Sequence, residues 1–116
     1  MQNDTIWHNC TNEDLLAILT ECPEVVEEMN RIGYNDLVNS YDALLPRYNM
    51  DRGTDPVTRK GSEEIDYFGC WYTIDGKDYN IAEKKGFKSK AEAQLASIKE
   101  TMYELQKRII AARKAH

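Results

Sequence analysis

The longest regular pattern of apolar side chains lies near the C-terminal end, in residues 90–114. Apolar residues recur there at spacings of four and three, at Ala91, Leu95, Ile98, Met102, Leu105, Ile109 and Ala112. This spacing places them on one face of an α-helix. Ser89 and Glu92 have the spacing of a capping box, which satisfies free amide groups at a helix start. We therefore predict a helix from Lys90 to Lys114, about 37 Å long at about 1.5 Å per residue.

Strand patterns precede this helix. Residues 65–74 are rich in aromatic and β-branched side chains, which favours a strand. Asp75 and Gly76 then favour a two-residue turn, because both turn positions need positive φ. Residues 79–83 predict the returning strand, and a further short strand is expected near Val57. Alternation divides the first strand into two faces, Tyr67, Gly69, Trp71 and Thr73 on one, and Phe68, Cys70, Tyr72 and Ile74 on the other. Both faces are partly aromatic, so the pattern leaves open which one packs on the helix.

The N-terminal segment, residues 1–50, predicts roughly three short helices. Pro23 separates the first two, because proline ends one helix and is tolerated at the start of the next. Gly33 is a suitable C-cap for the second helix, and Pro46 closes the third.

Residues 51–64 show no period and contain Gly53 and Pro56, so we predict an exposed loop there.

The expected fold class is α+β, with a helical subdomain at 1–50 and a β-hairpin, or three-stranded sheet, packed on the long helix at 65–116. We expect these parts to form one cooperative unit. A hairpin of about 17–20 Å covers only about half of that helix, so the rest of the apolar face requires the N-terminal helices or another chain.

The formal net charge of −5 is unevenly distributed. Residues 1–61 hold eleven acids and five bases, and residues 62–83 hold six acids and one base. Residues 84–116 reverse the balance with three acids and nine bases. The chain is therefore an acidic body with a basic C-terminal helix, an asymmetry that bears on partners rather than on fold.

No motif in the chain indicates catalysis. The two histidines, His8 and His116, lie near the ends of the chain, which are usually frayed. Cys10, Cys22 and Cys70 lack the spacing of a metal or redox site. No glycine-rich phosphate loop, signal peptide or membrane-length apolar run is present. We therefore expect a non-enzymatic cytoplasmic protein that uses no metal or cofactor.

Three features occur together around the hairpin: Gly69 and Trp71 in one strand, a two-residue turn, and the sequence GFKSKAEA at residues 86–93. Over residues 65–108 the chain resembles the arm-type DNA-binding domain of phage-type integrases and its APETALA-like plant relatives. The resemblance implies a three-stranded sheet packed on one helix, with the sheet face entering a DNA major groove. It also implies a phage or mobile-element origin.

In that family the sheet reads DNA with basic side chains, whereas the sheet predicted here is acidic. Our first hypothesis is therefore a non-enzymatic inhibitor that imitates nucleic acid and binds a nucleic-acid-handling protein of the host cell. Phage anti-CRISPR and anti-restriction proteins act in this manner. Charge complementarity favours such a partner, because its nucleic-acid groove is basic. The residues expected to contact it are Glu64, Asp66, Tyr67, Trp71, Asp75 and Asp78.

Two alternatives stay open. The second hypothesis is a DNA-binding accessory protein of integrase-arm type, which would contact phosphates through Arg52, Arg59, Lys60, Lys84, Lys85, Lys88 and Lys90. The third is a homodimeric structural protein that pairs through Leu95, Ile98, Met102, Leu105 and Ile109. A heptad-like stripe permits such pairing, but a helix that faces its own core has the same pattern.

Overall fold

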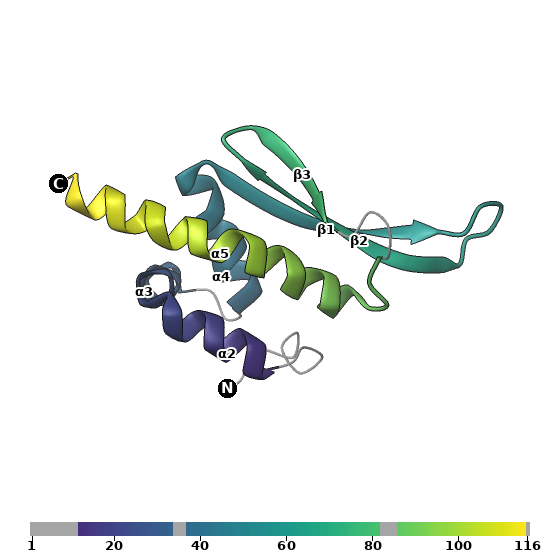
Figure 1. Ribbon diagram of the computed structural model, residues 1–116, viewed down its shortest axis with the longest axis horizontal. Helices are drawn as coiled ribbons and strands as arrows, with labels where there is room; N and C mark the ends of the chain where they lie inside the picture. Colours follow the sequence, from purple (N-terminus) through teal and green to yellow (C-terminus); the bar gives the residue numbers. More distant parts are fainter. Residues whose placement is uncertain (1–11, 34–36, 82–85, 116) are drawn as a thin grey trace.

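The computed structural model describes residues 12–33, 37–81 and 86–115. Within these ranges the elements are, in chain order, α2 (Asn12–Glu21), α3 (Pro23–Ile32), α4 (Leu37–Leu44), the 3₁₀ turn η1 (Leu45–Tyr48), β1 (Met50–Thr58), β2 (Ile65–Ile74), β3 (Lys77–Ile81) and α5 (Lys90–Lys114). The helices gather on one side of a three-stranded antiparallel sheet (Figure 1). The fold is therefore α+β, as the sequence predicts.

The long helix α5 has the bounds that the apolar spacing predicts. The hydroxyl oxygen of Ser89 accepts a hydrogen bond from the Glu92 amide at 3.2 Å. The Glu92 carboxylate in turn accepts a hydrogen bond from the Lys88 amide at 3.1 Å. The capping box therefore forms, and its returning bond reaches the residue before the N-cap.

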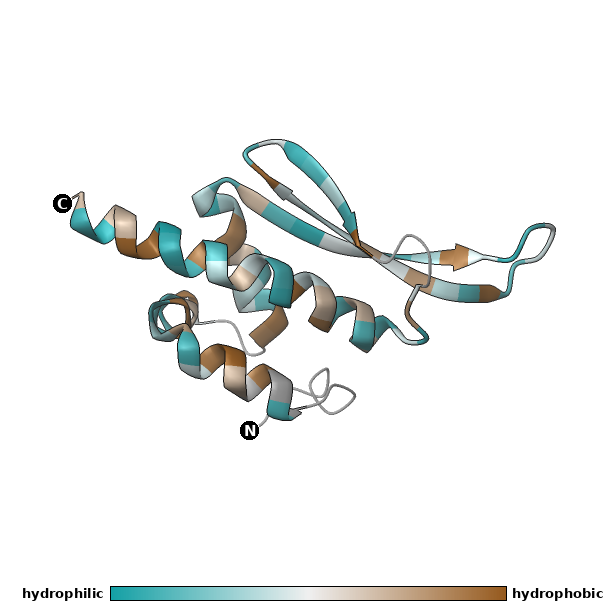
Figure 2. Cartoon of the chain, in the orientation of Figure 1, coloured by the Kyte–Doolittle hydropathy of each residue, from teal (hydrophilic) through white to brown (hydrophobic). Residues whose placement is uncertain are grey.

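The N-terminal helices cover the part of α5 that the sheet leaves free. In Figure 2 the hydrophobic colouring of α2 lies on the side that faces α5. Val25, Tyr41 and Leu44 are at most 1% exposed and belong to one core together with the apolar stripe of α5. The Tyr41 hydroxyl lies 2.6 Å from the Thr101 hydroxyl, which ties α4 to α5 by a buried hydrogen bond.

Two of the predicted helix signals have the expected geometry. Pro23 is the first residue of α3, where its missing amide proton costs nothing. Gly33 adopts a left-handed φ of 79°, and its amide donates to the Met29 carbonyl at 3.3 Å. Pro46 does not stop the helical path at once, because the chain continues through η1 to Tyr48.

The sheet has the strand order β1-β2-β3. Its second strand has the predicted bounds, and the turn after it has positive φ at Asp75 (54°) and Gly76 (81°), as the pair requires. β3 begins two residues before the predicted start and ends at Ile81. Further along, Phe87 pairs with Phe68 through two backbone hydrogen bonds of 2.8 Å, which returns the chain to β2 before α5 begins.

The strand expected near Val57 is present but longer than expected, and the loop predicted for residues 51–64 is wrong over most of its length, because β1 pairs with β2 along Met50–Thr58. Gly53 lies opposite Trp71, and a Cβ on Gly53 would lie 2.4 Å from the indole Cζ2 atom. The glycine therefore leaves room for a tryptophan. Pro56 is accommodated because β1 is an edge strand, where a missing amide proton is tolerated. Only the short connection at residues 59–64 is a turn.

Candidate functional site

One face of the sheet packs on α5 and the other is uncovered. Met50, Arg52 and Cys70 are buried on the helix side, which also carries Phe68, Tyr72 and Ile74. This settles which face meets the helix. We call the opposite side the open face, and it consists of Asp51, Gly53, Asp55 and Val57 of β1, Tyr67, Gly69, Trp71 and Thr73 of β2, and Asp78 and Asn80 of β3. In Figure 2 β3 is largely hydrophilic in colour.

Trp71 lies at the centre of the open face, held against Gly53. The neighbouring row pairs Asp51 with Thr73 and Thr73 with Asp78, which places one carboxylate on each side of the threonine. Asp55 lies on the opposite side of Trp71, across from Gly69. Three carboxylates thus surround a half-buried indole, and no Lys or Arg is present among the open-face residues. An aromatic centre with a polar surround is the usual layout of a protein interface.

The structure brings together some of the residues predicted to bind a partner. Tyr67, Trp71 and Asp78 share the open face. Glu64 and Asp66 lie instead at the far end of the β1–β2 hairpin, at 4.0 Å and 3.9 Å from the guanidinium of Arg59. The sequence analysis missed two carboxylates of the open face, because residues 51 and 55 fell in the predicted loop. Recognising β1 would have revealed them, since strand alternation places both on one side.

Asp75, another predicted partner residue, is bound within the chain. Its two carboxylate oxygens accept hydrogen bonds from Arg108 of α5 at 2.9 Å and 2.8 Å, and Asn49 donates to it at 2.9 Å. The hydrogen bonds from Arg108 and then Asn49 lower the pKa of Asp75 to about 2. The side chain is 59% exposed, but its carboxylate anchors the hairpin turn to α5.

Arg52 was predicted to contact nucleic acid, and the structure contradicts this role. The residue is only 7% exposed. Its guanidinium donates to both Asp42 oxygens at 2.8 Å and 3.1 Å, and to the Ser97 hydroxyl at 3.0 Å. Arg52 therefore joins β1, α4 and α5 in the interior and is not available to a partner.

The remaining predicted phosphate contacts are divided between two elements. Arg59 and Lys60 are exposed at the far end of the β1–β2 hairpin, and Lys88 and Lys90 are exposed at the start of α5. Lys84 and Lys85 lie outside the described residues. None of the described bases lies on the open face.

Two arginines of α5 form ion pairs with acids elsewhere in the same chain. Arg113 donates to Glu27 at 3.0 Å and to Glu28 at 2.7 Å, so it ties the end of α5 to α3. Arg108 binds Glu104 on its own helix at 2.8 Å in addition to the hairpin turn. Part of the charge difference between the acidic body and the basic helix is therefore neutralised by ion pairs within the chain.

The stripe predicted to pair two copies of the chain is buried inside one copy. Ile98, Met102, Leu105 and Ile109 are at most 1% exposed, and Leu95 is 9% exposed. The N-terminal helices and the sheet cover it, so a homodimer through this stripe is contradicted.

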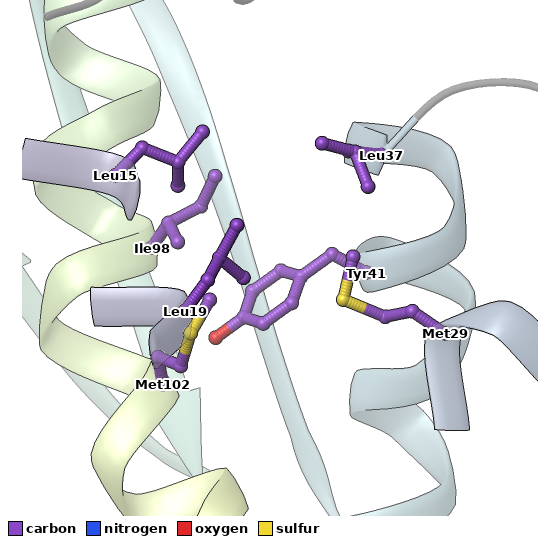
Figure 3. A pocket seen from close by; sticks show the side chains of 7 residues that line it. All are labelled: Leu15, Leu19, Met29, Leu37, Tyr41, Ile98 and Met102. Carbon is purple, nitrogen blue, oxygen red and sulfur yellow. The ribbon is translucent and has the colours of Figure 1, made fainter. Parts of the chain in front are cut away.

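A hollow of about 250 Å³ opens on the uncovered side of the sheet. Its open-face lining is Asp55, Val57, Tyr67, Gly69 and Asn80, and the paired residues Cys70 and Ile81 lie at its base. A second cavity lies in the helical core, where apolar side chains from four helices converge around Tyr41 (Figure 3). That cavity measures about 10 Å³ and is apolar, so it is a packing void rather than a ligand site.

The described part of the chain holds two buried thiols and no candidate metal cluster. Burial raises the pKa of the Cys22 and Cys70 thiols, for Cys70 to about 11, which keeps both protonated at neutral pH. Within the described ranges no three His, Cys, Asp or Glu side chains lie close enough to share a metal ion. His8, Cys10 and His116 fall outside those ranges.

Each described helix is too short or too polar to traverse a lipid bilayer.

The architecture defines a small α+β protein whose sheet is covered by helices on one side and presents an acidic, aromatic face on the other. In comparisons with family models, curated proteins and solved structures, nothing matches this chain.

Proposed function

We propose that the chain is a non-enzymatic protein-binding module whose open face docks on the basic surface of a nucleic-acid-handling protein. The observation that carries this proposal is the arrangement of Asp51, Asp55 and Asp78 around Trp71, with no base among the residues of that face. Carboxylates in this arrangement repel a phosphate backbone and attract a surface that normally binds one.

The state of these carboxylates supports the proposal. The side-chain carboxylates of Asp55 and Asp78 make no hydrogen bond or ion pair with any described residue. Asp51 accepts one bond, from the Arg52 amide at 2.8 Å, and stays exposed. Other acids of the molecule, by contrast, are bound by Arg108 and Arg113. The open face therefore holds negative charge that is not neutralised within the described part of the chain.

In the proposed mechanism, Trp71 supplies apolar contact at the centre of the interface, and the carboxylates around it pair with Lys or Arg of the partner. Occupying the basic groove excludes nucleic acid and inhibits the partner. This mode of action is that of an anti-CRISPR or anti-restriction protein encoded by a phage and acting in the host cytoplasm.

The test is capture from a nuclease-treated host lysate with immobilised wild-type chain and two charge variants. The Asp51→Lys/Asp78→Lys variant reverses the open face, and the Glu13→Lys/Glu63→Lys control makes the same change in net charge elsewhere. We expect the wild type and the control to retain the same nucleic-acid-binding protein, the open-face variant to lose it, and duplex DNA to displace it. Capture that survives the open-face reversal, or a complex that binds DNA simultaneously, would contradict the proposal.

Direct binding of DNA is tested separately by the mobility of a duplex at about 50 mM salt, where phosphate contacts are strong. We expect no shift, because Arg52 is internal and the remaining bases lie off the open face. A steeply salt-dependent shift that Lys88→Glu/Lys90→Glu abolishes would instead favour the DNA-binding accessory protein.

A further inference from the structure

The hollow on the open face lies beside the described end of β3. β3 ends at Ile81, which pairs with Cys70, while β1 and β2 continue side by side beyond that point. Gly69 has no side chain to fill the space, and a Cβ placed there would meet no atom within 4 Å. The volume of about 250 Å³ lies below the ~300–1,000 Å³ of ordinary small-molecule sites. The hollow is therefore of a size to receive one long side chain rather than a cofactor.

The walls combine apolar, aromatic and acidic groups. Val57 supplies aliphatic surface, and Tyr67 supplies an aromatic ring. The ring is fixed by the backbone of Gly86, where a Cβ would lie 2.1 Å from the ring carbon Cδ2. Asp55 supplies a carboxylate that has no partner within the described residues. A cationic group on a long apolar stem complements all of these surfaces at once.

We propose that this hollow binds an arginine side chain of the protein partner, an inference that rests on the proposed function and names the chemistry recognised. The guanidinium pairs with the carboxylate of Asp55 and lies against the ring of Tyr67, while the methylene stem packs on Val57. Arginine fits better than lysine, because its planar group can form two parallel bonds to a carboxylate and can stack on an aromatic ring. Arginine is also the residue with which nucleic-acid-binding surfaces hold phosphates, so the partner expected above supplies it.

Peptide binding tests this site without knowledge of the natural partner. The probes are fluorescein-labelled oligoarginine and oligolysine of equal length, titrated with the full chain and followed by fluorescence anisotropy. We expect the wild type to bind oligoarginine roughly fivefold more tightly than oligolysine, the size of an exposed cation–π contact with added carboxylate pairing.

Two substitutions, each with a matched control, test whether the hollow causes the preference for oligoarginine. Gly69→Val fills the hollow without changing charge, and we expect the two peptides then to bind equally. Thr73→Val is its matched control on the same strand and face, outside the hollow, and should keep the preference. Asp55→Asn removes the carboxylate with almost no change in shape, and should weaken oligoarginine more than Glu63→Gln, which removes the same charge elsewhere. Circular dichroism verifies that each variant is folded.

The outcomes separate this inference from the proposed function. Equal affinity of the wild type for both peptides, or a preference that survives Gly69→Val and Asp55→Asn, overturns the arginine site and leaves the acidic docking surface standing. Failure of both peptides to bind the wild type overturns the docking surface, and the arginine site with it.

Discussion

The two faces of the sheet differ in whether their charged side chains are bound by other groups of the chain. On the helix side, Arg52 is buried and each of its three described bonds goes to a side chain of a helix. On the open face, Asp55 and Asp78 are exposed and unpaired within the described residues. The same strands therefore carry a satisfied cation on one side and unsatisfied anions on the other. Charge on the helix side serves folding, and charge on the open face is available for the proposed binding.

Helix-side substitution should have the largest effect on stability. Arg52→Met removes the guanidinium and, with it, its hydrogen bonds to Asp42 and Ser97. We expect a loss of about 2–3 kcal/mol in the free energy of unfolding, less than the ~3–5 kcal/mol for a fully buried pair. The reason for the smaller value is that the Asp42 side chain is 39% exposed. Denaturant unfolding measures this, with Arg59→Met as the exposed control, and equal stability of the two variants would contradict a structural role for Arg52.

The contact between Gly53 and Trp71 gives the next largest effect. Gly53→Val places side-chain atoms where the indole lies, so the ring must move, at a cost of about 1–3 kcal/mol. Gly69→Val on the same face meets open space and should change stability by no more than about 0.5 kcal/mol. Unfolding free energies and tryptophan fluorescence compare the two. If both glycines tolerate valine equally, Trp71 is not held as the structure shows.

Acid should break the ion pair that holds the hairpin turn on α5. The pKa of Asp75 is lowered to about 2 in the folded chain, against about 3.9 for a free aspartate. The stabilisation is therefore complete above about pH 4 and is lost as the pH falls through about 2. Arg108→Gln should move the pKa of Asp75 back towards the free value, which carboxyl ¹³C NMR titration measures directly. An unchanged Asp75 titration in that variant would show that the ion pair is absent in solution.

The smallest effect is expected on the open face. Asp78→Asn removes a carboxylate that no described group uses, so the free energy of unfolding should change by less than about 0.5 kcal/mol. Affinity for oligolysine should nevertheless fall, since that carboxylate attracts cations. A large loss of stability would mean that the open-face acids serve folding after all, and the contrast between the faces would disappear.

Local signals in the sequence were sufficient for the elements that depend on neighbouring residues. The caps at Ser89 and Gly33 and the turn at Asp75-Gly76 have a sequence signature because their hydrogen bonds and φ angles are local. Only the part of β1 near Val57 was expected as a strand, because the glycine and proline of this segment resemble loop residues. The glycine is suited to the strand because a tryptophan of another strand lies against it, and the proline is tolerated because β1 is an edge strand. A local sequence pattern contains neither fact.

The candidate site was less predictable than the fold for the same physical reason. Whether a charged residue is free depends on partners that are distant in sequence. Arg52 meets Ser97 across 45 positions, and Asp75 meets Arg108 across 33. Net charge per segment therefore overestimated the free charge of α5, and a heptad-like stripe could not reveal that its partner was the same chain.

The two attachments of the sheet to α5 have a consequence for the kinetics of recognition. Arg108 fixes the hairpin turn near one end of the helix, and the Phe68–Phe87 pair fixes β2 just before the other end. The strands behind Trp71 are thus ordered before any partner arrives, so association need not wait for a conformational change. We expect the association rate to follow electrostatic attraction, falling as salt screens the open face, while the lifetime of the complex depends on the contacts made by the indole.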